Sequence, residues 1–299
     1  MPPHLHSERP QPFEREGSYP APWLTRRHFL LGGAVLLLCG GCATAPITGR
    51  RQLMAISSVQ ENALGVQAYR EVLRQEPITR DPTATEPLRR IVTRLAPVAE
   101  SVADGADFEW EVNAIKDDKT INAFVLPGGK IAVYTGIFPI AQTEAGMAII
   151  LGHEMGHAIA RHAGERVSQQ LGAQLVGTAL AVGIQGSPYG SMIMAAYGLG
   201  AQVGVLLPYS RTQEEEADEI GLVLAARAGY DPSVAIGVWE RMAQLPGRRP
   251  PEFLSTHPEP EGRIDNIKKM LPEAMAAFRP APDPGNTPLP SPQQISGAR

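Results

Sequence analysis

The segment from Ala145 to Arg161, AGMAIILGHEMGHAIAR, constrains the fold of this chain more than any other feature. From Ala145 to Ala160 its one formal charge is Glu154, and the other residues are apolar, small or histidine. Burial of a lone carboxylate costs several kcal/mol unless the group is paired or has a chemical use. The segment therefore predicts a helix that crosses the interior of the protein and carries Glu154 for a chemical reason.

Two histidines, His153 and His157, flank this glutamate with the HExxH spacing. Residues four apart lie on the same face of an α-helix, so both imidazoles can reach one ion. Glu154 is the next residue round the helix, close enough to contact a water molecule on that ion. The pattern predicts that the two histidines bind zinc and that Glu154 is the general base. The alternative is two buried histidines beside a stray glutamate.

The amino terminus is predicted to be an export signal. Thr25 to Leu30, TRRHFL, resembles the twin-arginine signal, and the apolar run from Phe29 to Leu38 follows it. Such a run is too short to span a bilayer as a helix, which takes about 20 apolar residues, but it suits the core of a secretory signal. The alternative is an uncleaved membrane anchor.

The run ends in Leu38-Cys39-Gly40-Gly41-Cys42, which resembles a bacterial lipoprotein cleavage site. Cys42 is the candidate lipidated residue, because two glycines precede it whereas leucines precede Cys39. Ala43 follows Cys42, so the Asp that usually retains such proteins in the inner membrane is absent. These are the only two cysteines, so the mature chain has no internal disulfide, and histidines and carboxylates must hold any metal.

Four regions are expected along the chain. Residues 1–41 are the signal peptide, residues 42–56 a polar tether, residues 57–275 one compact domain, and residues 276–299 a disordered Pro-rich tail. The formal net charge of −4 leaves no electrostatic footprint for nucleic acid, so no nucleic-acid partner is expected.

Apolar periodicity within the domain predicts helices on both sides of a few strands. The elements expected before the HExxH segment are two helices, a strand and a β-hairpin, over residues 57–76, 86–102, 108–115 and 121–134. Pro127-Gly128-Gly129 supplies the hairpin turn. The fold class is therefore α+β: mainly helical, with a small antiparallel β-sheet preceding the HExxH helix. Later helices are expected up to residue 228 and over residues 232–245 and 260–270.

The segment from residue 171 to residue 210 contains no charged residue. A Gly-Ser-Pro-Tyr-Gly stretch at residues 186–190 divides it into two apolar helices of about fifteen residues, short for a bilayer of about 30 Å. We favour a buried or surface-dipping helical hairpin, and a transmembrane hairpin is the alternative.

A catalytic zinc site holds three protein ligands and keeps a fourth position for water. On a continuous helix His162 points away from the metal face, and a solvated or capping role is expected for it. The acidic run from Glu214 to Glu219 is the densest source of a third ligand. Its i, i+4 pairs are Glu214 with Asp218 and Glu215 with Glu219, and helix geometry does not choose between them. The alternative is a solvated acidic helix start.

HEMGH, followed by YSRTQEEEAD and then STHPEPEGRI, resembles the M48 zinc metallopeptidases, most closely their bacterial lipoprotein members. TGRRQL after Cys42 and NAFVLPGGKIAVYTGI before the helix are also similar to that family. The resemblance covers most of the mature chain, from about Ile47 to Met270. It implies a zincin-like fold, one Zn²⁺ per chain, Glu214 as the third ligand, and Asp218 as the residue that orients a metal-bound histidine.

The resemblance also implies a function: an endopeptidase that cleaves unfolded or misfolded periplasmic and outer-membrane proteins. It would be a periplasmic lipoprotein, anchored to the outer membrane through Cys42, with the envelope assembly machinery as a partner. Substrate is expected to extend along the hairpin from Asn122 to Tyr134, with the Asn122 side chain binding its backbone. The alternatives are a metal-bearing chaperone-like or binding lipoprotein with little proteolytic activity, and an integral membrane peptidase.

His257 has three open interpretations. Pro258 follows it and disfavours helical geometry, so we expect His257 in an extended loop. Its imidazole would stabilise the oxyanion of the transition state, occupy the fourth zinc position in a resting enzyme, or fill a structural gap between the last two helices.

Overall fold

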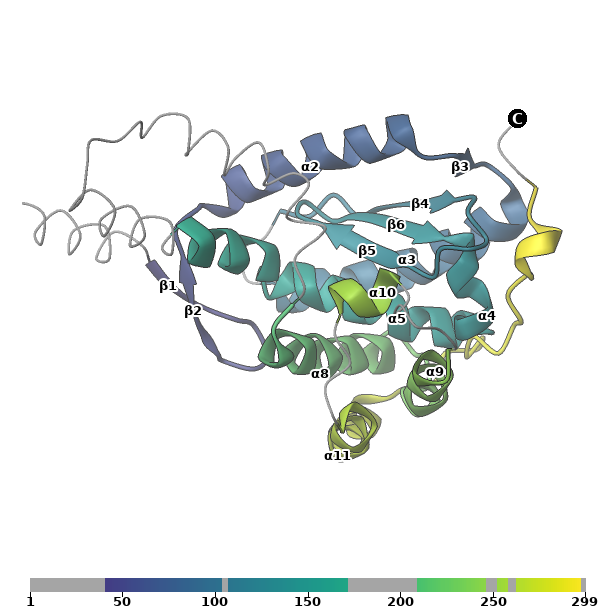
Figure 1. Ribbon diagram of the computed structural model, residues 1–299. Coiled ribbons are helices and arrows are strands. Elements are labelled where there is room, and N and C mark those ends of the chain that lie inside the picture. The colour runs from purple at the N-terminus through teal and green to yellow at the C-terminus, as the bar shows by residue number, and fades with distance from the viewer. Residues whose placement is uncertain (1–40, 104–106, 172–208, 246–251, 258–261, 297–299) are drawn as a thin grey trace, which may run out of the picture. The chain divides into compact units, whose positions relative to one another are not determined.

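The structure is a computed structural model that describes residues 41–103, 107–171, 209–245, 252–257 and 262–296 (Figure 1). The predicted signal peptide and nearly all of the apolar segment from 171 to 210 lie outside the described residues. In the described part, no helix combines the length and apolar character needed to cross a membrane.

A four-stranded sheet precedes the HExxH helix, as predicted, in the order β3-β4-β6-β5. Its strands are β3 (Ile78–Thr79), β4 (Glu111–Ile115), β5 (Ala123–Leu126) and β6 (Lys130–Tyr134). The predicted β5–β6 hairpin forms around Gly128 and Gly129, whose φ angles of 85° and 80° suit glycine. The sheet differs from the expected antiparallel one because β4 and β6 run parallel. The sheet is therefore mixed, and β5 is an edge strand.

Both faces of this sheet are covered by helices, which is why all five residues of β6 are buried. Ile131 and Val133 point into the main core, which they share with α3 (Pro82–Val102). Ala132 and Tyr134 point to the opposite face, where they pack with Tyr69 of α2 (Ser58–Gln75). This alternation follows the two-residue period of a strand.

The HExxH segment forms α5 (Glu144–Ile159), capped by the Thr143 side chain, and Ala158 is its one residue that is not fully buried. Helix α8 (Arg211–Arg227) begins at a capping box formed by Ser210 and Gln213. The two helices lie almost backbone to backbone, since a Cβ at Gly152 would be 2.9 Å from the Gly221 carbonyl oxygen. This close approach brings the acidic start of α8 to the histidine face of α5.

Shorter elements complete the domain. They are η1 (Thr135–Ile137), α4 (Phe138–Ala141), α9 (Val234–Ala243), α10 (Glu252–Thr256), α11 (Arg263–Ala277) and η2 (Pro292–Gln294). Helix α3 begins four residues before the expected start, capped by Asp81, and contains Pro87 and Pro97 without ending at either. Helix α11 likewise continues through Pro272.

The structure differs from the predicted tether at residues 42–56, because these residues form a hairpin. Strands β1 (Gly41–Thr44) and β2 (Arg51–Met54) pair antiparallel. Gly49 lies in the connecting turn with φ of 70°, and the side chains of Met54 and Ile56 are buried in the domain. The hairpin is therefore part of the folded domain.

The structure also differs from the predicted disordered tail, because residues 278–296 pack on the domain. The carbonyls of Gly285 and Thr287 accept hydrogen bonds from the backbone N–H groups of Ala145 and Glu144. These N–H groups belong to the first turn of α5, where a helix has no internal acceptors. Ile295 at the end of the tail is buried, so the segment caps the HExxH helix and closes over the core.

Candidate active site

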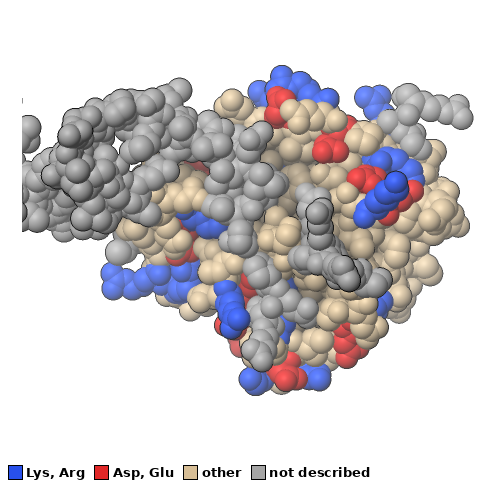
Figure 2. Space-filling view, viewed as in Figure 1, with Lys and Arg blue, Asp and Glu red and all other residues tan. Residues whose placement is uncertain are grey.

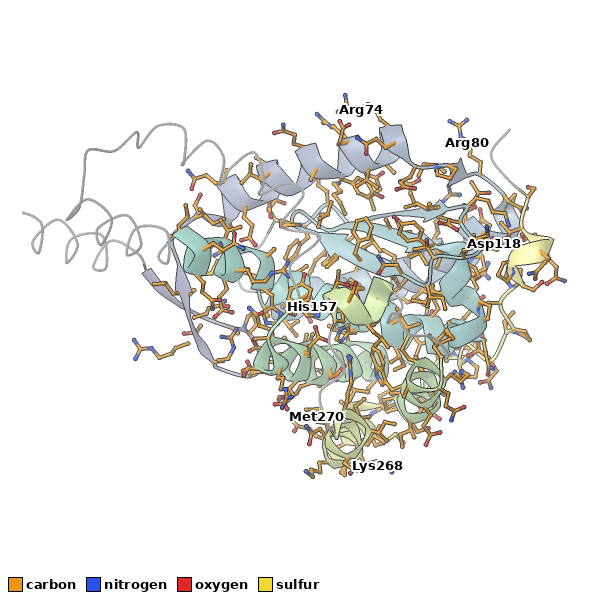
Figure 3. The ribbon with its side chains drawn as sticks, viewed as in Figure 1. Arg74, Arg80, Asp118, His157, Lys268 and Met270 are labelled. Atoms are coloured by element: carbon orange, nitrogen blue, oxygen red, sulfur yellow. The ribbon has the colours of Figure 1, made fainter. Side chains whose placement is uncertain are left out.

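Helix α5 places His153 and His157 on one face, with their Nε2 atoms 3.1 Å apart. Glu214, in the first turn of α8, reaches the same point: its Oε2 lies 3.5 Å from His153 Nε2 and its Oε1 lies 3.4 Å from His157 Nε2. All three side chains are 1% exposed or less. His157, on α5, is seen near the middle of the view, beside α10 and above α8 (Figure 3).

His257, immediately after α10, completes a group of four buried residues. Its Nδ1 lies 3.0 Å from Glu214 Oε1 and 3.4 Å from His153 Nε2. Its ring stacks on Phe253, and its backbone N–H donates to the Phe253 carbonyl at 2.7 Å. One ligand atom from each of the four residues lies within 4.8 Å of the others. His257 therefore faces the other three residues, as two of its three interpretations require. It is not in the extended loop that was expected, because its i to i−4 hydrogen bond to Phe253 continues the turn of α10.

Two buried carboxylate oxygens, one in this group and one beside it, accept no hydrogen bond from the described residues: Glu214 Oε2 and Glu154 Oε1. A buried acceptor without a partner is costly. Together with the converging imidazole nitrogens, the Glu214 oxygen gives the nitrogen and oxygen donor set that zinc takes in catalytic sites. The residues present thus fit a zinc ion.

The ionisation of Glu214 and His157 suits a cation, whereas His153 must lose a proton before it binds one. Burial raises the pKa of Glu214, but the neighbouring histidines outweigh that effect and hold it well below its usual range. Burial holds the pKa of His157 well below its usual range, so the ring is neutral near pH 7. Burial lowers the pKa of His153, but hydrogen bonds to Asp218 and Glu214 outweigh it and raise the pKa to about 9.

Glu154 points to the same space from the β5 side of α5. Its Oε1 lies 3.5 Å from His257 Nε2, and it accepts a backbone hydrogen bond from Val125 of β5. Burial, the largest effect, raises the pKa of Glu154, although His257 and His153 oppose it. A raised carboxyl pKa is closer to the value that an acid–base catalyst needs near pH 7.

Asp218 lies one turn after Glu214 and contacts the other nitrogen of His153, with Oδ1 2.9 Å from Nδ1. The Arg263 guanidinium donates to both oxygens of Asp218, at 2.9 Å from Nε and 2.7 Å from Nη2. Arg263 also lies over the Trp239 ring and within 3.3 Å of Glu214 Oε2. This buried arginine therefore holds Asp218 in place. The sequence motif that contains Arg263 gave no indication of this role.

The second acidic pair of α8 lies outside the site. Glu215 accepts a hydrogen bond from Asn266 of α11. Glu219 lines a surface depression with Glu215 and Glu273. Helix geometry alone left both pairs open, and the crossing with α5 brings Glu214 and Asp218 to the histidines.

The expectation that His162 is a solvated or capping histidine is wrong. It is fully buried, with Nδ1 2.8 Å from His157 Nδ1. The expectation assumed a continuous helix, but α5 ends at Ile159 and Arg161 takes φ of 56°. This left-handed residue turns the chain so that His162 returns to the back of the site.

Asn122 lies beside the site rather than on an open surface. It is 2% exposed and lines a small cavity with Tyr209 and His257. Tyr209, which the sequence reasoning missed, stacks on the His157 ring with 3.8 Å between ring centres. The Asn122 side-chain oxygen is buried and has no hydrogen-bond donor among the described residues.

The fold and this group of residues define a metallopeptidase of the HExxH class. The model of peptidase family M48 matches residues 82–271, and the chain belongs to this family. Membership confirms the predicted family and class, a zinc metallopeptidase, and the predicted zinc cofactor, because M48 enzymes use zinc.

Two relatives are the mitochondrial metalloendopeptidases OMA1 of Schizosaccharomyces pombe and Saccharomyces cerevisiae. The first is 37% identical over 231 residues, covering 77% of this chain and 66% of the relative. The second is 32% identical over 263 residues, covering 80% and 74%. The beta-barrel assembly-enhancing protease of Escherichia coli (strain K12) is 30% identical over 235 residues, covering 75% and 46%. The chain thus spans about half the length of that bacterial relative.

Proposed function

We propose that this protein is a zinc metalloendopeptidase of the bacterial cell envelope that cleaves unfolded or misfolded proteins. His153, His157 and Glu214 hold the zinc ion, and Glu154 is the general base. The observation that carries this proposal is the convergence of His153 Nε2, His157 Nε2 and the buried Glu214 carboxylate, whose Oε2 accepts no hydrogen bond from the described residues. A structural cluster would have satisfied this oxygen with a hydrogen bond.

When bound, zinc polarises the scissile carbonyl and makes a water molecule acidic enough to lose a proton near pH 7. Glu154 accepts that proton and passes it to the leaving amine. Asp218 accepts the Nδ1 proton of His153, which leaves the Nε2 lone pair for the metal. Burial of the site strengthens each of these electrostatic interactions.

Substrate recognition rests on strand β5. It is one of the two outer strands of its sheet, and it contacts Glu154 through Val125. An extended peptide that adds to this edge brings its backbone close to the general base, and main-chain pairing of this kind accepts many sequences. Asn122, just before β5, supplies a side-chain amide for the same backbone. On the face seen in Figure 2, acidic and basic residues lie mostly toward the margin, and the described residues visible between them are mostly uncharged. Main-chain pairing and an uncharged surface both suit the binding of unfolded polypeptides.

The envelope location rests on the amino terminus. A twin-arginine-like signal and a lipoprotein-like Cys42, followed by Ala43, favour a lipid anchor in the outer membrane. The name of the E. coli relative, a beta-barrel assembly-enhancing protease, supports envelope assembly machinery as a partner. Cys42→Ser should move the protein from the membrane pellet to the soluble periplasmic fraction, since a lipid chain contributes about 0.8 kcal/mol per buried CH₂. Retention in the pellet would refute lipid anchoring at Cys42.

The catalytic proposal is tested with reduced, unfolded casein and with a folded control protein. Wild-type protein should cleave casein, and Glu154→Gln should lose at least about 10²-fold in rate while keeping zinc, because it removes the base and leaves the ligands. Equal cleavage by both proteins would exclude Glu154 as the base. Casein binding without cleavage by the zinc-loaded wild type would instead support a chaperone-like or binding lipoprotein.

A further inference from the structure

A second chain of hydrogen bonds starts at the far side of His157. His157 Nδ1 lies 2.8 Å from His162 Nδ1, and His162 Nε2 lies 2.8 Å from Glu216 Oε2. The three side chains are buried. The role assigned to the metal site does not use His162 or Glu216, so this chain needs its own explanation.

This chain of hydrogen bonds ends in the turn of the β1–β2 hairpin. Arg50 Nε donates to Glu216 Oε2 at 2.7 Å, and the Thr48 hydroxyl donates to the other oxygen of Glu216. The two Nη atoms of Arg50 bind Glu165, at 2.8 and 2.7 Å. One guanidinium therefore joins two carboxylates, and it comes from a segment more than a hundred residues before either.

The carboxylate at the end of this chain fixes the direction of every hydrogen bond in it. Glu216 accepts from Arg50 and is an acceptor only, so His162 Nε2 must carry a proton and donate it. In the neutral His162 ring Nδ1 is then a lone pair, which accepts from His157 Nδ1–H. The His157 proton is thereby held on Nδ1, and its Nε2 lone pair is free toward Glu214. The opposite direction would put the His157 proton on Nε2 and block metal binding.

We propose that His162, Glu216 and Arg50 are positioning residues for His157. The β1–β2 hairpin, which contains Arg50, then contributes to the metal site. This inference rests on the proposed role of His157 as a metal ligand. The arrangement matches the one at His153, where Asp218 accepts the Nδ1 proton and Arg263 holds Asp218. Each metal-binding histidine is thus backed by a carboxylate and an arginine, with His162 inserted in the second case. Such outer partners fix the ring and its tautomer.

The hairpin also supplies a matched control. Arg51, the next residue, is exposed on strand β2, whereas Arg50 is 22% exposed and binds both carboxylates. Replacing each with methionine removes one positive charge from the same hairpin. Only Arg50→Met should release Glu216, so a change specific to this variant reports on the chain of hydrogen bonds rather than on net charge.

The test measures the zinc dissociation constant of the full chain by competition with a chelator, and the visible spectrum of the cobalt-substituted protein. Arg50→Met and His162→Leu should weaken zinc binding about 10- to 100-fold, the usual effect of losing an outer partner. They should also shift the cobalt bands. Arg51→Met should bind as wild type. His162→Asn keeps an acceptor at the Nδ1 position and should recover part of the loss. It also provides a folded variant if His162→Leu fails to fold.

The outcomes separate this inference from the function it rests on. If His157→Ala abolishes zinc binding but Arg50→Met and folded His162→Leu bind zinc as wild type does, the positioning role is wrong and the metal site stands. If His157→Ala leaves zinc affinity unchanged, the ligand assignment itself is wrong. Equal weakening by Arg50→Met and Arg51→Met would assign the effect to net charge and overturn the role of Arg50.

Discussion

His257 Nδ1 lies 3.0 Å from Glu214 Oε1, close enough for one zinc ion to bind both side chains. A ring at this position competes with water for the fourth place on the metal. This geometry favours the inhibitory interpretation of His257 over the transition-state one.

We therefore expect His257→Ala to raise the rate of casein cleavage. The increase should reach about tenfold if the His257 ring binds the metal about 1.4 kcal/mol more favourably than water does. The measurement is the initial rate at matched zinc content. A lower rate at unchanged zinc content would assign His257 to the transition state. Unchanged rate and zinc affinity would leave a structural role.

Zinc binding should release protons because of His153. Hydrogen bonds to Asp218 and Glu214 outweigh the effect of burial and raise its pKa to about 9, so the metal-free ring carries a proton at neutral pH. Zinc must displace that proton, so zinc affinity rises with pH until about pH 9. Asp218→Asn removes the leading hydrogen bond and lowers this pKa.

Calorimetry in buffers of different ionisation enthalpy counts these protons. At about pH 8 the wild type should release close to one proton more per zinc than Asp218→Asn, and the difference should vanish well above pH 9. Equal proton release by the two proteins at about pH 8 would mean that Asp218 does not keep His153 protonated.

The crossing of α5 and α8 leaves no room for a side chain at Gly221. A Cβ at Gly221 would lie 2.6 Å from the His153 backbone nitrogen, in a place with no flexible neighbour to move. Gly221→Ala should lower the free energy of unfolding by about 1–3 kcal/mol, the usual cost of overpacking, and should weaken zinc binding by displacing α8.

Gly237→Ala is the matched control, because a Cβ there would meet only the end of the flexible Arg241 side chain. It should be neutral or stabilise the protein by up to about 1 kcal/mol, since alanine favours a helix. Thermal melts of the two variants measure the difference. Equal melting temperatures would contradict the close packing of α5 on α8.

The site was predictable where its geometry is local. His153, Glu154 and His157 follow from helix spacing, and the β5–β6 hairpin follows from Gly128 and Gly129. Glu214 and Asp218 required the family resemblance, because the spacing of α8 alone fitted two pairs. Their approach to the histidines depends on a crossing between segments about 60 residues apart.

The sequence could not predict the contacts that depend on one dihedral angle or on distant partners. The left-handed conformation of Arg161 turns His162 back into the site. This conformation is uncommon for residues other than glycine, so the sequence does not predict it. Arg50 finds Glu216 across more than a hundred residues, so its segment looked like a polar tether. The parallel pairing of β4 with β6 likewise depends on the loop between β4 and β5.

Zinc content per chain of two neighbouring variants tests the central claim most directly. Glu214→Gln and Glu215→Gln change the same charge on adjacent residues of α8, but only Glu214 faces His153 and His157, while Glu215 binds Asn266. Metal analysis after dialysis against a weak chelator should find close to one zinc in the wild type and in Glu215→Gln, and almost none in Glu214→Gln. Equal zinc in the two variants, or loss in Glu215→Gln alone, would contradict the proposed metal site.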